Sequence, residues 1–231
     1  AAGLAFTYNK LTSKSNAFSL GAKVNGPGYS VAGSQFLVNA ANNGEILNLA
    51  LTVPVSNVAG IGGAVAINRI DSDAIAIVDS VYTDATGIVK TVSDSHVSGF
   101  ENVSAAAEEK SSIKAISGSF AFGGQAAVGG AVAYNEITGK TGAHMNNIAV
   151  DAKNVLIKGV NDADIWTMAS GCGGSGEVAV QGAATTGEIS RTVAAGMDNV
   201  SASKTDSFVD ILAESTGEIN NKSKKIKYFI F

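Results

Sequence analysis

The chain has 231 residues, of which 45% are hydrophobic and only 16% charged, and its formal net charge is −4. Its 16 Lys and Arg residues are thinly spread apart from four within residues 222–227, which argues against a nucleic-acid partner. The 27 glycines could indicate disorder, but regularly placed Val and Ile residues predict a thin packed core instead. A single cysteine excludes an internal disulfide bond, and no apolar run is long enough to predict a membrane span.

One motif recurs along the chain at a spacing of 52–67 residues. Its four copies occupy residues 3–11, 62–70, 129–137 and 181–189. The similarity extends upstream, where residues 46–63 align without gaps on 113–130 and 165–182, and a further half-copy begins at Val209. Self-similarity on this scale indicates an array of stacked units rather than a globular enzyme.

Within each unit, runs of Val, Ile, Ala and Thr bounded by Gly, Asn, Asp and Ser predict short strands of about five residues. The best helix candidate, residues 104–110, aligns with residues 37–43 and 156–162, which are poor helix formers, so it is also predicted to be strand. Short strands at unequal spacing favour an all-β fold, a parallel β-helix (β-solenoid) with insertions in its loops. Since one coil usually takes roughly 20–25 residues, each repeat should hold two or three coils. A pair of β-sandwiches is the alternative.

Comparison of the four copies predicts the environment of two aligned positions. One position accepts only Asn or Gly, which reach positive φ at the least cost, and it is predicted to be a left-handed turn at a strand end. Its members are Asn9, Asn68, Asn135 and Gly187. The second position is always aliphatic and is predicted to point inward. Its members are Leu11, Ile70, Ile137 and Ile189.

Three further columns complete the pattern. The residue between those two positions is always charged but changes sign, so it is predicted to face water without a specific ligand; it is Lys10, Arg69, Glu136 or Glu188. A column of invariant alanines predicts tight packing, at Ala5, Ala64, Ala131 and Ala183. A partly aromatic column, Tyr8 and Tyr134 with Ile67 and Thr186, is either core or an exposed ladder suited to protein contacts.

Two motifs resemble sites of chemistry without meeting the requirements of those sites. Residues 171–176 match G-x-G-x-x-G, but a dinucleotide site needs a helix after the motif, and none is predicted. Cys172 would need an activating histidine, and neither His96 nor His144 recurs in the other copies. Cys172 is therefore predicted to be a packing residue.

Some acidic residues are spaced as in metal-binding loops or in glycosidases. The segments 71–73 and 161–164 offer alternating oxygen ligands, but neither matches a known calcium loop, and Asx residues at strand ends usually form turns. Asp71, Asp73, Glu108 and Glu109 could pair as in glycosidases, but Trp166 is the only tryptophan available to line a sugar groove. No catalytic residue, cofactor or metal is predicted.

The repeats cover residues 1–219, and residues 220–231 form a basic and apolar tail outside the pattern. The chain begins inside a repeat unit, so it is predicted to be a piece of a longer protein.

The segments 112–118, 127–137 and 64–70 resemble repeats of filamentous-haemagglutinin-class adhesins, which Gram-negative bacteria export by two-partner secretion. The repeats are most similar to those of fusobacterial leukotoxin-type adhesins, although residues 185–187 of the fourth copy depart from them. The resemblance implies a right-handed parallel β-helical shaft that is secreted or displayed on the bacterial surface. It also implies an outer-membrane secretion partner, and a host protein or glycan as the contact.

Several alternatives remain open for the function. The segment could be a spacer within the shaft, part of a host-cell-damaging leukotoxin, or a β-solenoid enzyme acting on polysaccharides. A trimeric autotransporter head is disfavoured because its repeat is far shorter.

Overall fold

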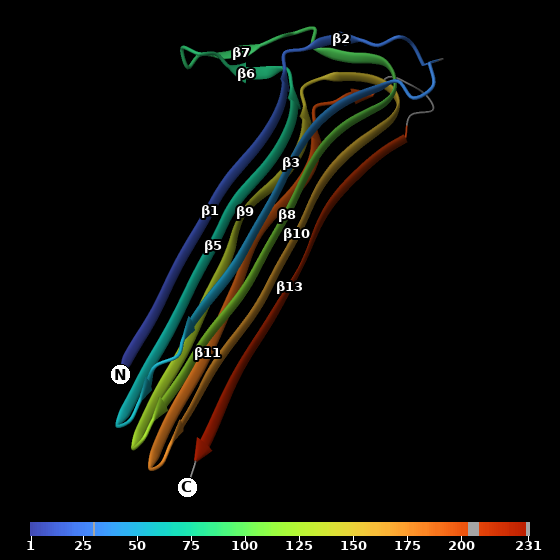
Figure 1. Cartoon of the computed structure of the whole chain (residues 1–231). Helices are drawn as coiled ribbons and strands as arrows, with labels where there is room; N and C mark the ends of the chain where they lie inside the picture. The colour runs from blue at the N-terminus through green and yellow to red at the C-terminus, as the bar shows by residue number, and fades with distance from the viewer. Residues whose placement is uncertain (30, 203–207, 230–231) are drawn as a thin grey trace.

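The computed structural model describes residues 1–29, 31–202 and 208–229, and the regular structure of these residues consists of β-strands without helix. Two long sheets of parallel strands lie face to face (Figure 1). Sheet A contains, in this order, β1 (Ala2–Leu20), β5 (Ala59–Asp79), β9 (Ala126–Asn146) and β11 (Val178–Asp198). The long strands of sheet B are β3 (Gln35–Thr52), β8 (His96–Gly123), β10 (Ala149–Ser175) and β13 (Phe208–Phe229). The all-β prediction is confirmed.

Five short strands complete the described structure. Three of them extend sheet B, namely β2 (Lys23–Asn25), β4 (Val55–Ser56) and β12 (Ser201–Ala202). The other two, β6 (Val81–Thr83) and β7 (Val89–Thr91), form an antiparallel hairpin that projects beyond one end of the sheets (Figure 1). The helix candidate 104–110 lies within β8, so its prediction as strand is confirmed.

Each repeat corresponds to one passage of the chain through sheet A and then sheet B, which we call a circuit. Asn9 lies opposite Asn68 in the sheet, Asn68 opposite Asn135, and Asn135 opposite Gly187. The predicted two or three coils per repeat are therefore wrong, as are the five-residue strands. The long strands run for 18 to 28 residues because Gly, Asn and Ser residues inside them keep the two-residue alternation of burial.

The unequal repeat spacing arises in the connections at one end of the sheets. β5 and β8 are joined through the β6–β7 hairpin, whereas β9 and β10 are joined by only Asn147 and Ile148. Asn147 has a φ of 52°, and Asn199 has the same φ at the connection after β11. Insertions thus lie in loops while the strands stay in register, as predicted.

The buried side chains differ along the length of the sheets. A cluster of Val, Ala, Ile and Met residues fills the part nearest this end, and the isoleucines of the inward column fill the middle. Ile70 and Ile137 are fully buried there, with Leu11 and Ile189 partly buried beside them. Beyond them lies an alanine cluster that includes Ala64.

Glycines occupy the end of the sheets beyond the alanine cluster, where the two backbones approach closely. A Cβ atom on Gly60 would overlap the carbonyl oxygen of Phe122. A Cβ atom on Gly171 would lie 2.5 Å from the carbonyl oxygen of Gly182, which is closer than real Cβ contacts allow. These glycines are required by the close approach of two backbones.

The strand β13 continues across the predicted boundary between residues 219 and 220. It pairs in register with β10 from Asn154–Phe208 to Ser175–Phe229. Residues 220–229 therefore extend sheet B, and residues 230–231 of the predicted tail lie outside the described residues.

We expect Ile70→Asp to destabilise the chain strongly because it buries an unpaired carboxylate between the stacked side chains of Leu11 and Ile137. The expected cost is about 3 kcal/mol or more, or a fall in Tm of about 10 °C. Thermal unfolding followed by circular dichroism measures this effect. The matched control is Ile61→Asp on the same strand, where the side chain is 52% exposed and little change is expected. Equal Tm values for the two variants would contradict the inward assignment.

Candidate functional site

The column of asparagines forms a hydrogen-bonded ladder inside the molecule. The Asn9 Nδ2 atom donates to Asn68 Oδ1 at 2.9 Å, and Asn68 Nδ2 donates to Asn135 Oδ1 at 2.7 Å. From sheet B, Asn48 Nδ2 donates to the same Asn68 oxygen at 2.6 Å. Asn135 Nδ2 ends the ladder by donating to Thr167 Oγ1 at 2.6 Å.

The predicted turn role of this column is therefore wrong. Asn9, Asn68 and Asn135 lie within strands, Asn68 and Asn135 are fully buried, and none of the three has a positive φ. An amide is both donor and acceptor, so identical amides can bond to one another from strand to strand. Gly187 occupies the same column, and there a Cβ atom would come within 2.8 Å of Ile219 Cγ2.

A buried ion pair joins Glu109 of sheet B to Arg191 of sheet A. The two side chains are 0% and 1% exposed, respectively. The Ser72 hydroxyl donates to Glu109 Oε1 at 2.5 Å, and Ser111 donates to the same oxygen. Arg191 Nε donates to Asn161 Oδ1 at 3.1 Å. Glu109 is thus enclosed and cannot serve as the glycosidase acid considered from the sequence.

Arg191 reaches Glu109 by passing over Gly139. Gly139 pairs with Arg191 in the sheet and has a φ of 137°. The pairing between β5 and β9 is interrupted at this point. Arg191 Nη1 donates there to the carbonyl oxygen of Ser72, at 2.9 Å, and to the carbonyl oxygen of Thr138. Burial lowers the pKa of the Arg191 guanidinium, and the attraction of Glu109 opposes that shift. The pair ties the second circuit to the fourth.

The other acidic candidates do not converge on one site. Asp71 accepts a hydrogen bond from Thr138 Oγ1 at 3.3 Å, and Asp73 accepts one from the Lys140 backbone nitrogen at 2.9 Å. Glu108 lies on the outer face of sheet B, opposite in direction to Glu109, and pairs with Lys158 at 2.8 Å. Asn161 is buried, whereas Asp164 is exposed. Within residues 1–29, 31–202 and 208–229, no three His, Cys, Asp or Glu side chains gather around a possible metal position.

Neither the glycine motif of residues 171–176 nor Cys172 lies next to the partners that a nucleotide site or a catalytic site would need. Gly171 and Gly173 face sheet A, and the chain continues after them into a turn and β11 rather than a helix. Cys172 Sγ contacts Ser170 Oγ at 3.4 Å. Cys172 lies on the outer face of sheet B and His144 on the outer face of sheet A, so the two do not form a catalytic pair.

The tyrosine column lies on the outer face of sheet A. Tyr8 is 54% exposed, and Tyr134 is half-buried with its hydroxyl donating to Glu136 Oε2 at 3.3 Å. Burial raises the pKa of Tyr134, and the negative charge of Glu136 adds to that shift. The charged column runs beside it, and Arg69 Nε donates to Glu136 Oε2 at 2.8 Å. Both columns are therefore part of the surface, as was predicted for the charged one.

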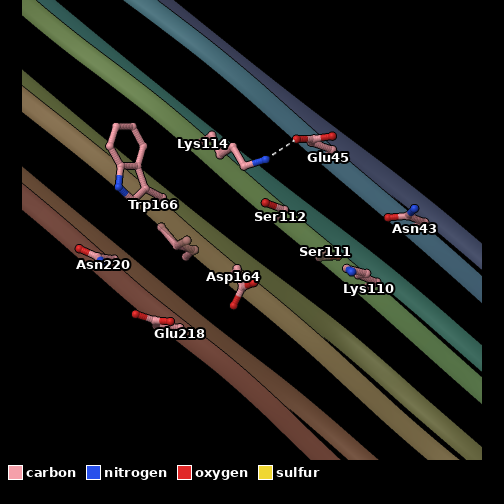
Figure 2. Close-up of a pocket in the computed structure, with 11 residues that line it drawn as sticks. Asn43, Glu45, Lys110, Ser111, Ser112, Lys114, Asp164, Trp166, Glu218 and Asn220 are labelled. Carbon is pink, nitrogen blue, oxygen red and sulfur yellow. Dashed lines mark hydrogen bonds and ion pairs between the residues drawn. The ribbon is translucent and has the colours of Figure 1, made fainter.

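The outer face of sheet B carries a hollow of about 560 Å³ around Trp166, which we call the Trp166 trough (Figure 2). Its lining includes Asn43, Glu45, Lys110, Ser112, Lys114, Asp164, Trp166, Glu218 and Asn220. In the sheet, half-buried Trp166 of β10 lies between Lys114 of β8 and Asn220 of β13. Two residues earlier on the same strands, Asp164 and Glu218 likewise lie opposite each other.

Some charged side chains of the trough form an ion pair, whereas others have no partner of opposite charge. Lys114 Nζ forms an ion pair with Glu45 Oε1 at 3.0 Å (Figure 2). Among the described residues, no hydrogen bond or ion pair involves the carboxylates of Asp164 and Glu218. Like charges on directly neighbouring strands are unfavourable unless another group neutralises or binds them. The site is not apparent in the sequence because its members come from four distant segments, which become adjacent only when each repeat forms one circuit.

No family model, curated protein or solved structure matches the chain. The described residues contain no helix of the length and apolar character needed to cross a membrane.

We expect Glu109→Ala to cost about 3–5 kcal/mol, since it leaves the Arg191 guanidinium buried without its counter-charge. The double variant Glu109→Leu with Arg191→Met should recover much of this loss, because both buried charges are then removed. Urea unfolding of Glu109→Leu, Arg191→Met and the double variant, beside Glu109→Ala, measures the coupling between the side chains.

The matched control is Glu136→Ala, which breaks the ion pair of Glu136 with the exposed Arg69 and should cost much less. Additive effects of the two single substitutions at Glu109 and Arg191 would show that the ion pair does not join the circuits energetically.

Proposed function

We propose that the chain is a segment of a right-handed parallel β-helical shaft from a secreted or surface-displayed bacterial filamentous adhesin. On this proposal its outer faces contact a host protein or glycan, and the parent protein is exported through an outer-membrane secretion partner. The observation that carries the proposal is the in-register stacking of one repeat on the next. The resemblance of residues 64–70, 112–118 and 127–137 to adhesin repeats supports it.

The dimensions of the circuit favour a contact surface over a spacer. Each circuit advances the stack by only one strand spacing, about 4.8 Å, whatever the length of its strands. A repeat of 52–67 residues therefore adds no more length than a coil of roughly 20–25 residues would. The additional residues widen the two faces, to about 60 Å along a strand of 19 residues such as β1. Broad faces provide area for contact with a partner, but they do not make the shaft longer.

Buried and accessible positions alternate along the strands of such a shaft, so its stability and its contact with a partner depend on different residues. The inward positions of β5 are buried and hold the stack together, whereas the residues between them are accessible. The charged column changes sign from Arg69 to Glu136 without disturbing the isoleucines next to it. Outer side chains can thus vary to suit a partner at little cost to the fold.

We expect the labelled chain to bind host epithelial cells or leukocytes saturably while the cells remain intact. Flow cytometry with a membrane-impermeant dye measures binding and membrane integrity together. The Ile70→Asp variant is the control for a folded surface and should not bind. Dye entry would favour the leukotoxin alternative, and the absence of binding to both cell types would contradict a contact role for these circuits.

A further inference from the structure

The Trp166 trough combines an aromatic plane with polar groups spread along an open surface. Trp166 is the only tryptophan of the chain, and its indole stands on the outer face of sheet B rather than in the core (Figure 2). Small-ligand sites pair aromatic side chains with a few placed polar groups in this way. Next to the indole in the sheet, Asn220 offers both a donor and an acceptor.

The unpaired carboxylates indicate what kind of ligand the trough suits. Asp164 and Glu218 are acceptors only, so a ligand that satisfies them must supply hydrogen-bond donors. Hydroxyl groups are such donors, and they would also bond with Ser112 and Asn220. A ligand with one apolar face and many hydroxyl groups at its edge matches both the indole and its surroundings.

The balance of charge disfavours an anionic ligand. The Lys114 ammonium is engaged by Glu45, which leaves Lys110 as the remaining cation of the lining. With the exposed carboxylates of Asp164 and Glu218, the lining has three acidic and two basic side chains, so its formal charge is −1. Phosphate, sulfate and sialic acid groups would meet repulsion here.

The hollow crosses four neighbouring strands, β3, β8, β10 and β13. A second hollow of about 280 Å³ shares Asn43 and Lys110 with the first and continues past Lys158 and Asp162. An extended ligand could therefore occupy both hollows. We propose that the Trp166 trough binds a neutral oligosaccharide, with one sugar ring stacked on Trp166 and its hydroxyl groups donating to Asp164 and Glu218. This inference rests on the proposed role of the outer faces in contact.

The single tryptophan provides a direct assay. The intact chain is titrated with chitohexaose, cellohexaose and lacto-N-neotetraose while the tryptophan emission is recorded, and heparin hexasaccharide serves as the anionic comparison. We expect at least one neutral probe to change the emission saturably, and heparin to bind more weakly or not at all.

Variants measured by calorimetry locate the site. Trp166→Ala should weaken binding of the active probe about tenfold or more, and Trp166→Phe should weaken it less. Asp164→Asn and Glu218→Gln should each weaken it as well. Leu47→Ala is the matched control, because Leu47 lies in the same row of the sheet, is 78% exposed and does not line the hollow. Unchanged Tm values confirm that the variants are folded.

Failure of all three neutral probes to saturate would overturn the inference, as would unchanged affinity in Trp166→Ala or binding of heparin alone. The cell assay separates this failure from that of the proposed function. Cell binding by the unaltered chain, without saturable binding of any neutral sugar, retains the contact role and removes the saccharide site. Sugar binding without cell binding retains the site and removes the host-contact role.

Discussion

Stacking in register is the constraint on which the rest of the structure depends. An inward side chain of a central strand has the aligned residues of the neighbouring repeats directly above and below it, one strand spacing away, and a facing column from the other sheet. Most inward positions are therefore filled by residues that pack well against side chains of a similar kind. The structure uses three solutions, namely aliphatic chains at Ile70 and Ile137, alanines or glycines where the sheets converge, and amides at Asn68 and Asn135.

Two polar arrangements are buried between the sheets, the asparagine ladder and the Glu109–Arg191 ion pair, and they differ in their contribution to stability. The asparagine ladder satisfies each amide through its neighbour, so burying it leaves little hydrogen-bonding capacity unused. The Glu109–Arg191 pair is costlier to bury because both groups lose their hydration. A hydrophobic pair could stack at least as favourably, but it would accept any neighbouring circuit. The guanidinium fits only where Gly139 leaves room for it and where Glu109 faces it from the other sheet, so the pair fixes the position of the fourth circuit relative to the second, with the third circuit between them.

The sequence predicted the all-β class and the aligned columns of the repeats, but not the length of the strands or of a coil. The aligned columns of the repeats turned out to be the registers of the sheets, because each repeat stacks directly on the next. The coil length failed because Gly62, Asn68 and Ser72 resemble turn residues when they are seen alone. Inside the stack, Asn68 and Ser72 find hydrogen-bond partners and Gly62 meets a closely packed side chain, and a single sequence does not show those partners. The Trp166 trough was missed for the same reason, since Lys114, Trp166 and Asn220 are distant in the chain.

The same constraint explains why a binding site can arise on an outer face at all. The interior must repeat from circuit to circuit, so most positions there are not free to specialise. The outer positions carry no such requirement, and the row Leu47, Lys114, Trp166, Asn220 contains four different kinds of side chain across one sheet. Strands of 18 residues or more place many such rows side by side on a rigid surface. A stack whose interior is uniform can therefore carry a distinct site on each stretch of its face, with the backbone of the sheet holding every side chain in place.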